Sequence, residues 1–506
     1  MPVPTPRAAA YPTGGLTAEV VVVGAGAAGI AAAEGIAAGT VTPEPSGRAF
    51  AEHPGLRIVI VDDAPAGRAG WGPRLVLATL HEAAARHLTW GEAAELARRA
   101  RHDVVTQHEE RLLALQQRLG PQVLVLPGRA RFARHGTVIV EPKGASGAAG
   151  SHRIAARRVV LATGCVPAMP EVTGLLDTAF VTAAEVDGLL DVERPPTTIA
   201  VLGAGSTGCA LAQALARLGA SVTLVDGNSS VLSGEDPDAA AAVTAALQRD
   251  GVRLLLGSPV VKVAPTLDGG AWLGTAAGID VAAERLVLAA GWRAASAGLD
   301  LPAVGVRLGP AGTVRVDSAL VSSAPEVLAA GGVVAGQPHA AAALAMGAVA
   351  GANSVARRPS AAWSAAAVAT LTLTDPEVAS VGLTGPDAIR ARREAGSPTA
   401  VGTVLWSQVQ RAVLCGPGEG FVRVIVGGAA GPGGRWMLRR TAPLPARVLG
   451  ATVVGPRAGD LVTPLALAIG SGLPASALAT AVSADPTWSS ALQLAVTRAC
   501  EAPTGG

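Results

Sequence analysis

The sequence is poor in cysteine and in aromatic residues. Its 506 residues include four cysteines, one tyrosine and four phenylalanines. Cys165, Cys209, Cys415 and Cys500 lie far apart, without a C-x-x-C spacing or a histidine pair at zinc-ligand spacing. This pattern argues against a metal site and against a disulfide framework. We expect buried thiols in a reducing compartment, and we therefore expect a cytoplasmic protein.

Net charge and uninterrupted apolar segments are also scarce. The formal net charge is +2 and no block of like charge occurs, so nothing indicates a nucleic acid or an anionic membrane surface as a partner. The longest apolar runs are interrupted by glycine turns, by Glu34 or by short polar turns, which argues against a membrane span. The first fifteen residues, MPVPTPRAAAYPTGG, lack the apolar core of a signal peptide, so we expect residues 1–17 to form a loose leader.

The chain does contain one pattern twice. Residues 19–39, EVVVVGAGAAGIAAAEGIAAG, and residues 198–226, TIAVLGAGSTGCALAQALARLGASVTLVD, each predict a strand, a glycine turn and a helix. In a G-x-G-x-x-G motif the first glycine permits the tight turn, the second lets the backbone approach a pyrophosphate, and the third lets the helix pack on the strand. The sequence therefore predicts two dinucleotide sites, at Gly24, Gly26 and Gly29 and at Gly203, Gly205 and Gly208.

An acid is expected at the end of the second strand of each unit, where it holds a ribose hydroxyl. Asp226 follows SVTLV at close to the expected spacing from the second glycine motif. Asp62 or Asp63 arrives later in the first unit, because residues 40–55 form an inserted loop rich in proline and glycine. The alternative is that these acids only solvate the strand ends.

Further segments, each read as a strand and a turn, follow along the chain in a recognisable order: residues 157–170 (RRVVLATGCVPAMP), 285–296 (RLVLAAGWRAAS), 326–336 (EVLAAGGVVAG), 371–384 (LTLTDPEVASVGLT) and 447–455 (RVLGATVVG). With them, the chain resembles the flavoprotein disulfide reductases with two dinucleotide-binding domains, the family of dihydrolipoamide dehydrogenase, glutathione reductase and mercuric reductase. The resemblance extends from about Val20 to about Val496.

The resemblance implies an α/β fold with two Rossmann-like dinucleotide-binding domains, for FAD and NAD, and a C-terminal α+β dimerisation domain that forms a homodimer. We expect the FAD domain at residues 18–195 and 282–358, the NAD domain at 196–281, and the interface domain at 359–506. A long helix within residues 88–120 is expected behind the flavin site, with His102 and His108 in solvent.

The resemblance also assigns cofactor residues. A helix that starts near His339 is expected to direct its N-terminus at the pyrimidine end of the flavin. Residues 227–234, GNSSVLSG, lack the arginines that receive a 2′-phosphate, so we expect NADH in preference to NADPH. The implied FAD residues are Gly24, Gly26, Gly29, Asp62, Ala162, Thr163, Gly164, Gly331, Gly332, His339 and Ala340. The implied NAD residues are Gly203, Gly205, Gly208, Asp226 and Gly291.

Four features of the family pattern are replaced here. The family's loop G-G-T-C-x-x-x-x-C-x-P-S-K corresponds to AGRAGWGPRLVLATL at residues 66–80, which has no cysteine, and its lysine position is Leu75. The His and Glu of the family's acid–base dyad correspond to Asp485 and Ser490. The Glu after the second glycine motif is Ala210, and the Asp of the family's A-x-G-D is Gly332.

Four side chains are candidates for the cavity that the dithiol leaves. Trp71 covers the flavin or stacks a planar substrate, or else only packs. Arg74 neutralises charge near the flavin or binds an anionic substrate, or else lies in solvent. His339 moves protons or caps a helix, and Asp485, supplied by the second subunit, is a candidate acid or base.

The sequence thus predicts an FAD-dependent, NADH-linked oxidoreductase. Its flavin acts directly on a small organic substrate, either a quinone-like acceptor or a biosynthetic intermediate, and we expect an enzyme that is not a disulfide reductase. Two alternatives remain open. One is an FAD oxidase or dehydrogenase with a vestigial NAD domain, and the other is a non-catalytic protein that binds flavin or nucleotide.

Overall fold

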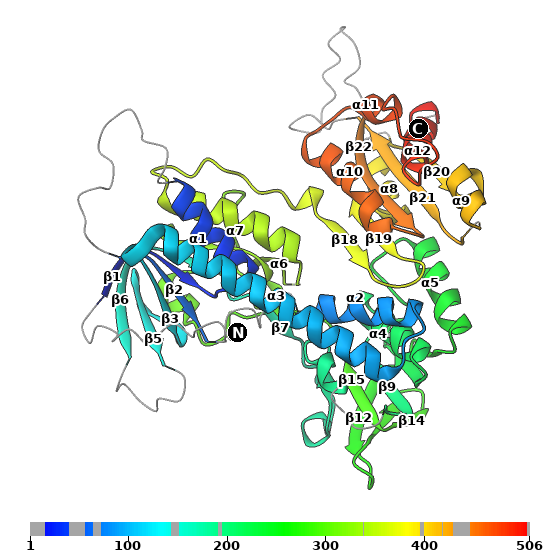
Figure 1. The fold of residues 1–506 in the computed structure, drawn as a ribbon, viewed down its shortest axis with the longest axis horizontal. Helices are drawn as coiled ribbons and strands as arrows, with labels where there is room; N and C mark the ends of the chain where they lie inside the picture. The colour runs from blue at the N-terminus through cyan, green and yellow to red at the C-terminus, as the bar shows by residue number, and fades with distance from the viewer. Residues whose placement is uncertain are drawn as a thin grey trace. The chain divides into compact units, whose positions relative to one another are not determined.

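The computed structural model divides the chain into two compact units (Figure 1). The first unit contains residues 1–76, 98–168 and 291–363, and the second contains residues 77–97, 169–290 and 364–506. The structure describes residues 16–39, 56–63, 72–142, 151–190, 195–336, 338–394, 399–416, 418–428 and 446–502. The predicted loop at residues 40–55 and all but the last two residues of the predicted leader lie outside the described residues.

A seven-stranded sheet forms the centre of the first unit, in the order β3-β2-β1-β6-β5-β4, with β17 paired to β6. The strands β1, β2, β3, β6 and β17 run parallel, and β4, β5 and β6 form an antiparallel meander. The strand bounds are β1 Leu16–Val23, β2 Leu56–Asp62, β3 Val123–Pro127, β4 Arg129–Arg134, β5 Thr137–Glu141, β6 His152–Leu161 and β17 Val327–Ala329.

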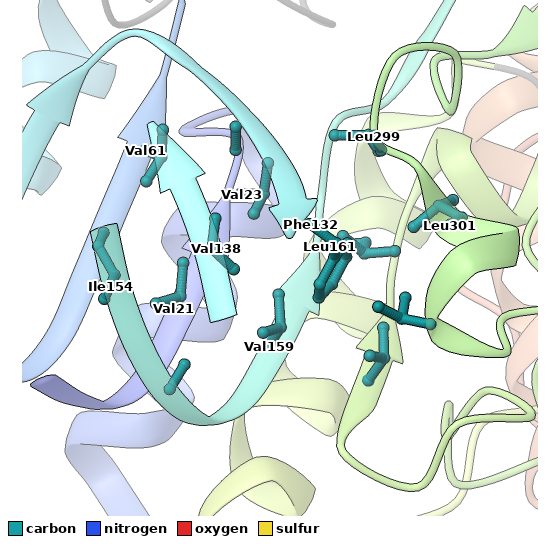
Figure 2. Packing of buried hydrophobic residues seen from close by; sticks show 14 of the residues in the cluster. Val21, Val23, Val61, Phe132, Val138, Ile154, Val159, Leu161, Leu299 and Leu301 are labelled. Atoms are coloured by element: carbon teal, nitrogen blue, oxygen red, sulfur yellow. The ribbon is translucent and has the colours of Figure 1, made fainter. Parts of the chain in front are cut away.

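Both faces of this sheet are buried, because its central strands are continuous runs of β-branched residues. Val20 and Val22 of β1 face a cluster that includes residues of three helices, α1 (Ala27–Gly39), α3 (Trp90–Leu119) and α7 (Ala340–Val355). Val21 and Val23 face the opposite cluster, in which Phe132 and Val138 of the meander pack with Leu299 and Leu301 (Figure 2).

Helices α1 and α7 pack backbone to backbone, and Figure 1 shows them side by side. A Cβ added at Gly347 would lie 2.2 Å from the carbonyl oxygen of Ala28, and one added at Gly351 would lie 2.2 Å from that of Ala32. From the other helix, a Cβ at Gly35 would lie 2.8 Å from the carbonyl oxygen of Ala348. Only glycine fits at these positions without a shift of the backbone.

Shorter elements complete the first unit. Strand β7 (Cys165–Pro167) pairs antiparallel with β16 (Trp292–Ala294). The turns η1 (Gly120–Gln122), η4 (Leu301–Val304) and η5 (Pro310–Gly312) and the short helix α6 (Gly332–Ala335) lie between the strands. Helix α2 (Gly72–Ala85) begins in the first unit and ends in the second.

The second unit begins with another parallel sheet, in the order β11-β10-β9-β15-β8. Its strands are β8 Val181–Thr182, β9 Thr198–Leu202, β10 Ser221–Val225, β11 Arg253–Leu255 and β15 Arg285–Leu288, with the helices α4 Ser206–Arg217 and α5 Pro237–Arg249 and the turns η2 Leu175–Asp177 and η3 Val186–Leu189. An antiparallel sheet follows α5 and β11, with strands β12 Val260–Pro265, β13 Ala271–Thr275 and β14 Asp280–Ala283.

The C-terminal part of this unit is a five-stranded antiparallel sheet in the order β18-β19-β22-β21-β20. Its core contains Trp406, whose ring meets that of Trp488 edge to face at 5.4 Å. The elements are β18 Ala369–Thr372, β19 Val378–Gly382, β20 Thr399–Leu405, β21 Phe421–Gly427, β22 Arg447–Val454, α8 Gly385–Glu394, α9 Gln410–Cys415, α10 Ala458–Gly470, α11 Ala475–Ala479, α12 Ser490–Glu501, η6 Ala365–Ala367 and η7 Trp406–Gln408.

The predicted fold class is confirmed: the chain is α/β, with two Rossmann-like parallel sheets and a C-terminal α+β part. In the part of the chain that the structure describes, no helix is long and apolar enough to cross a bilayer. One expectation about the cysteines is wrong. Cys415 and Cys500 are exposed, because each stands at the last turn of a surface helix, whereas Cys209 is buried and Cys165 is partly buried.

Candidate functional site

The first glycine loop connects β1 to α1 in a conformation that only glycine tolerates. Gly24 has φ +105°, and its backbone nitrogen donates to the carbonyl oxygen of Val61 at 2.7 Å. A Cβ at Gly24 would lie 2.4 Å from the carbonyl oxygen of Ala162, and one at Gly29 would lie 1.8 Å from that of Gly24. Gly26 accepts from the nitrogen of Ile30 at 3.0 Å, so it begins the hydrogen-bond ladder of α1.

Two further turns lie at the same edge of the sheet, where the parallel strands β1, β6 and β17 end. Gly164 (φ +77°) follows β6, and Gly331 (φ +77°) follows β17. A Cβ at Gly331 would lie 2.9 Å from the side chain of Ala28 in the first turn of α1. The carboxyl ends of parallel strands form the ligand crevice of such sheets, and the structure brings the predicted residues together there.

Thr163 lies within this edge and has an unsatisfied side chain. Its hydroxyl oxygen is buried and has no hydrogen-bond partner among the described residues. The backbone nitrogen of Thr163 lies 3.1 Å from the position that a Cβ at Gly24 would take, so the residue adjoins the first glycine loop. A buried hydroxyl without a partner is costly, and a bound polar ligand would satisfy it.

His339 and Asp62 complete the set of predicted flavin-side residues. His339 is the N-cap of α7: its Nδ1 accepts from the backbone nitrogen of Ala342 at 3.1 Å, and Ala340 is the first helical residue. Asp62 ends β2, and its carbonyl oxygen accepts from the nitrogen of Gly128 at 2.8 Å. The neighbouring Asp63 pairs with Arg129 at 3.4 Å on the surface.

The second glycine loop repeats the first in the second unit. Gly203 has φ +113°, and a Cβ there would lie 2.4 Å from the carbonyl oxygen of Ala289. A Cβ at Gly208 would lie 1.8 Å from the carbonyl oxygen of Gly203. Gly205 is the N-cap of α4 and has no heavy atom within 4 Å of its would-be Cβ. The middle glycine therefore faces open space, as a backbone that must approach a phosphate requires.

Asp226 holds this loop through both carboxylate oxygens. Its Oδ2 accepts from the nitrogen of Ala204 at 2.6 Å, and its Oδ1 accepts from the nitrogen and the side-chain amide of Asn228 at 2.7 and 2.9 Å. Since an ionised carboxylate oxygen can accept two hydrogen bonds, Oδ2 keeps one acceptor position. Sequence reasoning missed Asn228, although its place two residues after the acid is a common signal for a side-chain turn.

Gly291 was predicted for the NAD side. The structure places it at the start of the segment 291–363 of the first unit, with φ +100° and with its carbonyl oxygen accepting from the nitrogen of Ala168 at 2.9 Å. Its role toward a nucleotide stays a prediction.

Two histidines have roles that the sequence did not reveal. The expectation that His108 lies in solvent is wrong: the residue is 3% exposed, and its Nε2 lies 2.7 Å from the carbonyl oxygen of Ala25 in the first glycine loop. Burial, aided by the charge of Arg111, holds the pKa of His108 below its usual value. His102, six residues earlier on the same helix, is exposed as expected.

His81 of α2 occupies a similar position in the second unit. Its Nε2 lies 2.8 Å from the carbonyl oxygen of Ala210, the position at which the family pattern has Glu. Burial lowers the pKa of His81 to about 4, so the ring is neutral at pH 7. Nearby, Gln213 and Arg217 of α4 both bond to Asp250, at 2.7 and 3.0 Å.

The four predicted cavity residues are only partly described. Trp71 and the side chain of Arg74 lie outside the described residues, although the backbone of Arg74 is in the first turn of α2. Asp485 is exposed in the single chain and precedes a short series of hydroxyls in which Thr487 contacts Ser489 at 2.8 Å. In the described ranges, no group of His, Cys, Asp or Glu is arranged to hold a metal ion.

Thiol chemistry is disfavoured at the two buried cysteines. Burial raises the pKa of Cys165 to about 11 and that of Cys209 to about 12. Both are therefore protonated at neutral pH, whereas a thiol that attacks a disulfide or a flavin must be ionised.

Two glycine cradles at the ends of two parallel sheets define the class of fold: a protein with two Rossmann-like domains of the dinucleotide-binding type. The chain belongs to the pyridine nucleotide-disulphide oxidoreductase family: residues 18–347 match the family model of that description, and residues 443–496 match the model of the family's dimerisation domain. Members of this family use FAD with NADH or NADPH, and the dimerisation domain supports a homodimer.

Similar proteins include mercuric reductases and a dihydrolipoyl dehydrogenase. The mercuric reductase of Acidithiobacillus ferrooxidans is 32% identical over 349 residues, which cover 69% of this chain and 58% of the relative. The mercuric reductase of Streptomyces lividans is 30% identical, with 68% of each chain covered. The dihydrolipoyl dehydrogenase of Thermus scotoductus is 31% identical over 304 residues, which cover 59% and 61% of the two chains. The match thus spans less than two thirds of the first of these relatives.

Solved structures show the same fold over nearly the whole chain. LpdA from Mycobacterium tuberculosis is 22% identical and superposes with a TM-score of 0.76, covering 96% of this chain and 99% of LpdA. The HOCl-induced flavoprotein disulfide reductase RclA from Escherichia coli is 20% identical, with a TM-score of 0.74 and coverage of 95% and 99%.

One prediction about the enzyme class is overturned by these comparisons. We expected a flavin-dependent oxidoreductase that is not a disulfide reductase. The relatives are mercuric reductases and dihydrolipoyl dehydrogenases, and a structural neighbour is a flavoprotein disulfide reductase. The chain therefore groups with the disulfide reductases. The prediction failed because it judged the class from one loop and one dyad, whereas the family pattern extends over most of the chain.

The described residues fit an FAD pyrophosphate with one departure. Gly24 and Gly29 leave no space for a Cβ, and the buried hydroxyl of Thr163 lacks a partner among the described residues. The departure is Gly332, which offers no carboxylate. A Cβ at Gly332 would lie 3.0 Å from both the nitrogen and the Sγ of Cys165, so the thiol occupies the space from which an acidic side chain would extend.

Proposed function

We propose that this chain is an NADH-dependent flavoprotein reductase of the disulfide oxidoreductase family, in which electrons pass from FAD directly to a small-molecule acceptor. The acceptor class is a quinone-like compound or a biosynthetic intermediate. The observation that carries the proposal is the pair of complete glycine cradles in a chain whose first cysteine is Cys165. The segment between β2 and α2 therefore supplies no thiol.

The flavin side would be held by the first glycine loop and by the edge formed by Thr163, Gly331 and Gly332. When bound, FAD supplies two-electron chemistry, accepting a hydride from NADH and delivering it to the acceptor. The balanced reaction with a quinone is NADH plus a proton plus quinone giving NAD⁺ plus hydroquinone. From the sequence alone, we propose that Trp71 and Arg74, together with Asp485 of the partner subunit, serve the acceptor site.

His339 is the N-cap of α7 in this proposal, with its Nδ1 accepting from the nitrogen of Ala342 at 3.1 Å. The N-terminus of α7 carries partial positive charge and would stabilise negative charge on a reduced ring nearby. In this proposal the helix end that His339 caps would lie at the pyrimidine end of the flavin.

The nicotinamide side is proposed to prefer NADH. Asp226 keeps one acceptor position on Oδ2 for a ribose hydroxyl, whereas a 2′-phosphate at that position would meet a like charge. The sequence from Gly227 to Gly234 offers no arginine or lysine to neutralise a phosphate. Both features favour a free 2′-hydroxyl.

The test is an anaerobic absorption titration of the purified protein with NADH and, separately, with NADPH. We expect flavin bands that bleach with one equivalent of NADH and that return when a benzoquinone is added. A count of titratable thiols before and after reduction tests the direct route: the count stays constant if no dithiol takes part. Two new thiols on reduction, or bleaching that needs two equivalents, would refute the direct route.

Other outcomes separate the alternatives. A protein that is bleached by NADH but is reoxidised by oxygen faster than by any quinone or small disulfide is an oxidase. A yellow protein that neither nucleotide bleaches has a vestigial NAD domain. A colourless protein that does not bind added FAD is not a flavoenzyme.

A further inference from the structure

His108 is a buried polar side chain that the proposed chemistry does not use. It lies on α3 within the first unit, at 3% exposure, and its Nε2 lies 2.7 Å from the carbonyl oxygen of Ala25. Ala25 is the residue between the first two glycines of the first motif. A side chain 83 positions away in sequence thus contacts the loop that is built to approach a pyrophosphate.

The contact fixes the direction of one peptide group. The peptide between Ala25 and Gly26 is planar and trans, so its carbonyl and its N–H point in opposite directions. Because the carbonyl is bonded to His108 on the side of α3, the N–H of Gly26 points to the opposite side. Gly26 is the second glycine, whose backbone approaches the phosphates in this motif.

The protonation state of His108 suits this task. A carbonyl oxygen only accepts, so Nε2 must carry the hydrogen. Burial lowers the pKa of the ring, and the nearby charges oppose each other, since Arg111 lowers it and Glu34 raises it. Arg111 and Glu34 also pair with each other at 2.6 Å, which ties α3 to α1 one turn away from His108. A neutral donor is therefore held in place at pH 7.

We infer that His108 is a positioning residue of the dinucleotide site: it orients the Ala25–Gly26 peptide so that the N–H of Gly26 faces the pyrophosphate of the bound cofactor. This inference rests on the proposed function only in taking a dinucleotide as the ligand. The inference gives α3 a role beyond packing, since the helix fixes the orientation of one peptide group of the glycine loop through a single hydrogen bond.

Three variants test the role. His108→Phe keeps a ring of similar size and removes the donor, and His108→Gln keeps an N–H donor. His102→Phe, on an exposed position of the same helix, is the matched control. The apoprotein is titrated with FAD, followed by flavin fluorescence. ADP and adenosine are measured by their competition with FAD, so that only the first glycine loop is reported, and the thermal midpoint is measured without ligand.

We expect His108→Phe to weaken FAD and ADP by about tenfold each, the effect of one lost hydrogen bond at a buried site, and to leave adenosine binding unchanged. His108→Gln is expected to recover part of the loss, and His102→Phe is expected to behave as the wild type. If His108→Phe lowers the thermal midpoint but binds FAD and ADP as the wild type does, the residue only packs and the inference is wrong. The same holds if adenosine is weakened as much as ADP.

The experiment also separates this inference from the proposed function. Wild-type protein that binds FAD and ADP but is not bleached by NADH would contradict the proposed reaction and leave the role of His108 supported by its ADP result. Wild-type protein that binds neither FAD nor ADP would overturn both. If His108→Phe does not fold, His108→Leu, which also removes the donor, takes its place: weaker ADP with unchanged adenosine supports the role, and an equal loss of both refutes it.

Discussion

Arg423 makes a buried ion pair whose loss is expected to destabilise the second unit strongly. Its guanidinium, on β21, donates to Oδ2 of Asp236 at 2.7 Å and to Asp238 at 2.7 Å, and it stacks 4.6 Å from the ring centre of Phe421. Asp236 is 1% exposed and is the N-cap of α5, where its Oδ1 accepts from the nitrogen of Asp238 at 2.9 Å. The substitution Arg423→Met therefore leaves a buried carboxylate with a cap bond and no cation.

The expected loss in free energy of unfolding follows from the burial of the ion pair. Removing one partner of a buried pair costs roughly 3–5 kcal/mol, and we expect the lower end because the side chain of Arg423 is 20% exposed and water can reach its place. The matched control is Arg249→Met. Arg249 pairs with Glu419 at 3.1 Å with both side chains more than half exposed, so its loss is expected to cost less than about 1 kcal/mol.

The assay is urea unfolding followed by tryptophan fluorescence, because Trp406 is fully buried in the core of the same sheet. The double variant with Asp236→Asn is expected to cost less than the sum of the two single variants, since a neutral amide no longer needs the cation. Equal losses for Arg423→Met and Arg249→Met would refute the argument that burial, and not the mere presence of an ion pair, sets the cost.

Three further predictions concern His81, Asp226 and Gly29. The pKa of His81 is about 4 in the fold and about 6.5 in the unfolded chain, so its contribution to stability is present above pH 6.5 and is lost as pH falls toward 4. The lost free energy of unfolding approaches about 3 kcal/mol. His81→Asn should flatten the pH dependence of unfolding between pH 6.5 and 4 and leave it unchanged above pH 7. Asp226→Ala should weaken NADH by about tenfold more than NADPH in a fluorescence titration, because both nucleotides lose the loop contacts to Ala204 and Asn228 and only NADH also loses the ribose contact; equal losses for both would argue against a ribose contact. Gly29→Ala should lower the free energy of unfolding by about 3 kcal/mol or more and abolish flavin retention, because the new Cβ would lie 1.8 Å from a carbonyl oxygen. The control Gly91→Ala, whose new Cβ would have nothing within 4 Å, should purify with the wild-type flavin content.

The sequence predicts the parts of this molecule whose causes are local. The two glycine motifs require particular backbone angles within six residues, and Asp226 follows its strand directly, so their positions could be inferred from spacing. The long helix α3 was predicted from its own helical spacing, whereas the start of α7 near His339 was predicted from the family resemblance.

Contacts between distant segments could not be inferred in this way. His108 and His81 bond to carbonyl groups 83 and 129 positions away, and nothing in the residues around either histidine indicates that partner. The exposure of Cys415 and Cys500 depends on which face of a short helix is covered, which the cysteine pattern does not encode. The class of the enzyme was misjudged because departures at a few positions were given more weight than the agreement of the whole order of segments.

The contact between α1 and α7 restricts which substitutions these two helices can accept. Most buried positions accept exchange among apolar residues, but Gly35, Gly347 and Gly351 accept none, because any added atom meets the backbone of the other helix. The N-terminal ends of the same two helices carry the first glycine loop and His339. A larger side chain at these positions would force the two helix backbones apart and alter the spacing of the two ends. The alanine-rich and glycine-rich composition that looks unspecific in the sequence is thus required here by the close approach of two helices, and a change in mid-helix would be felt at the site that their N-terminal ends form.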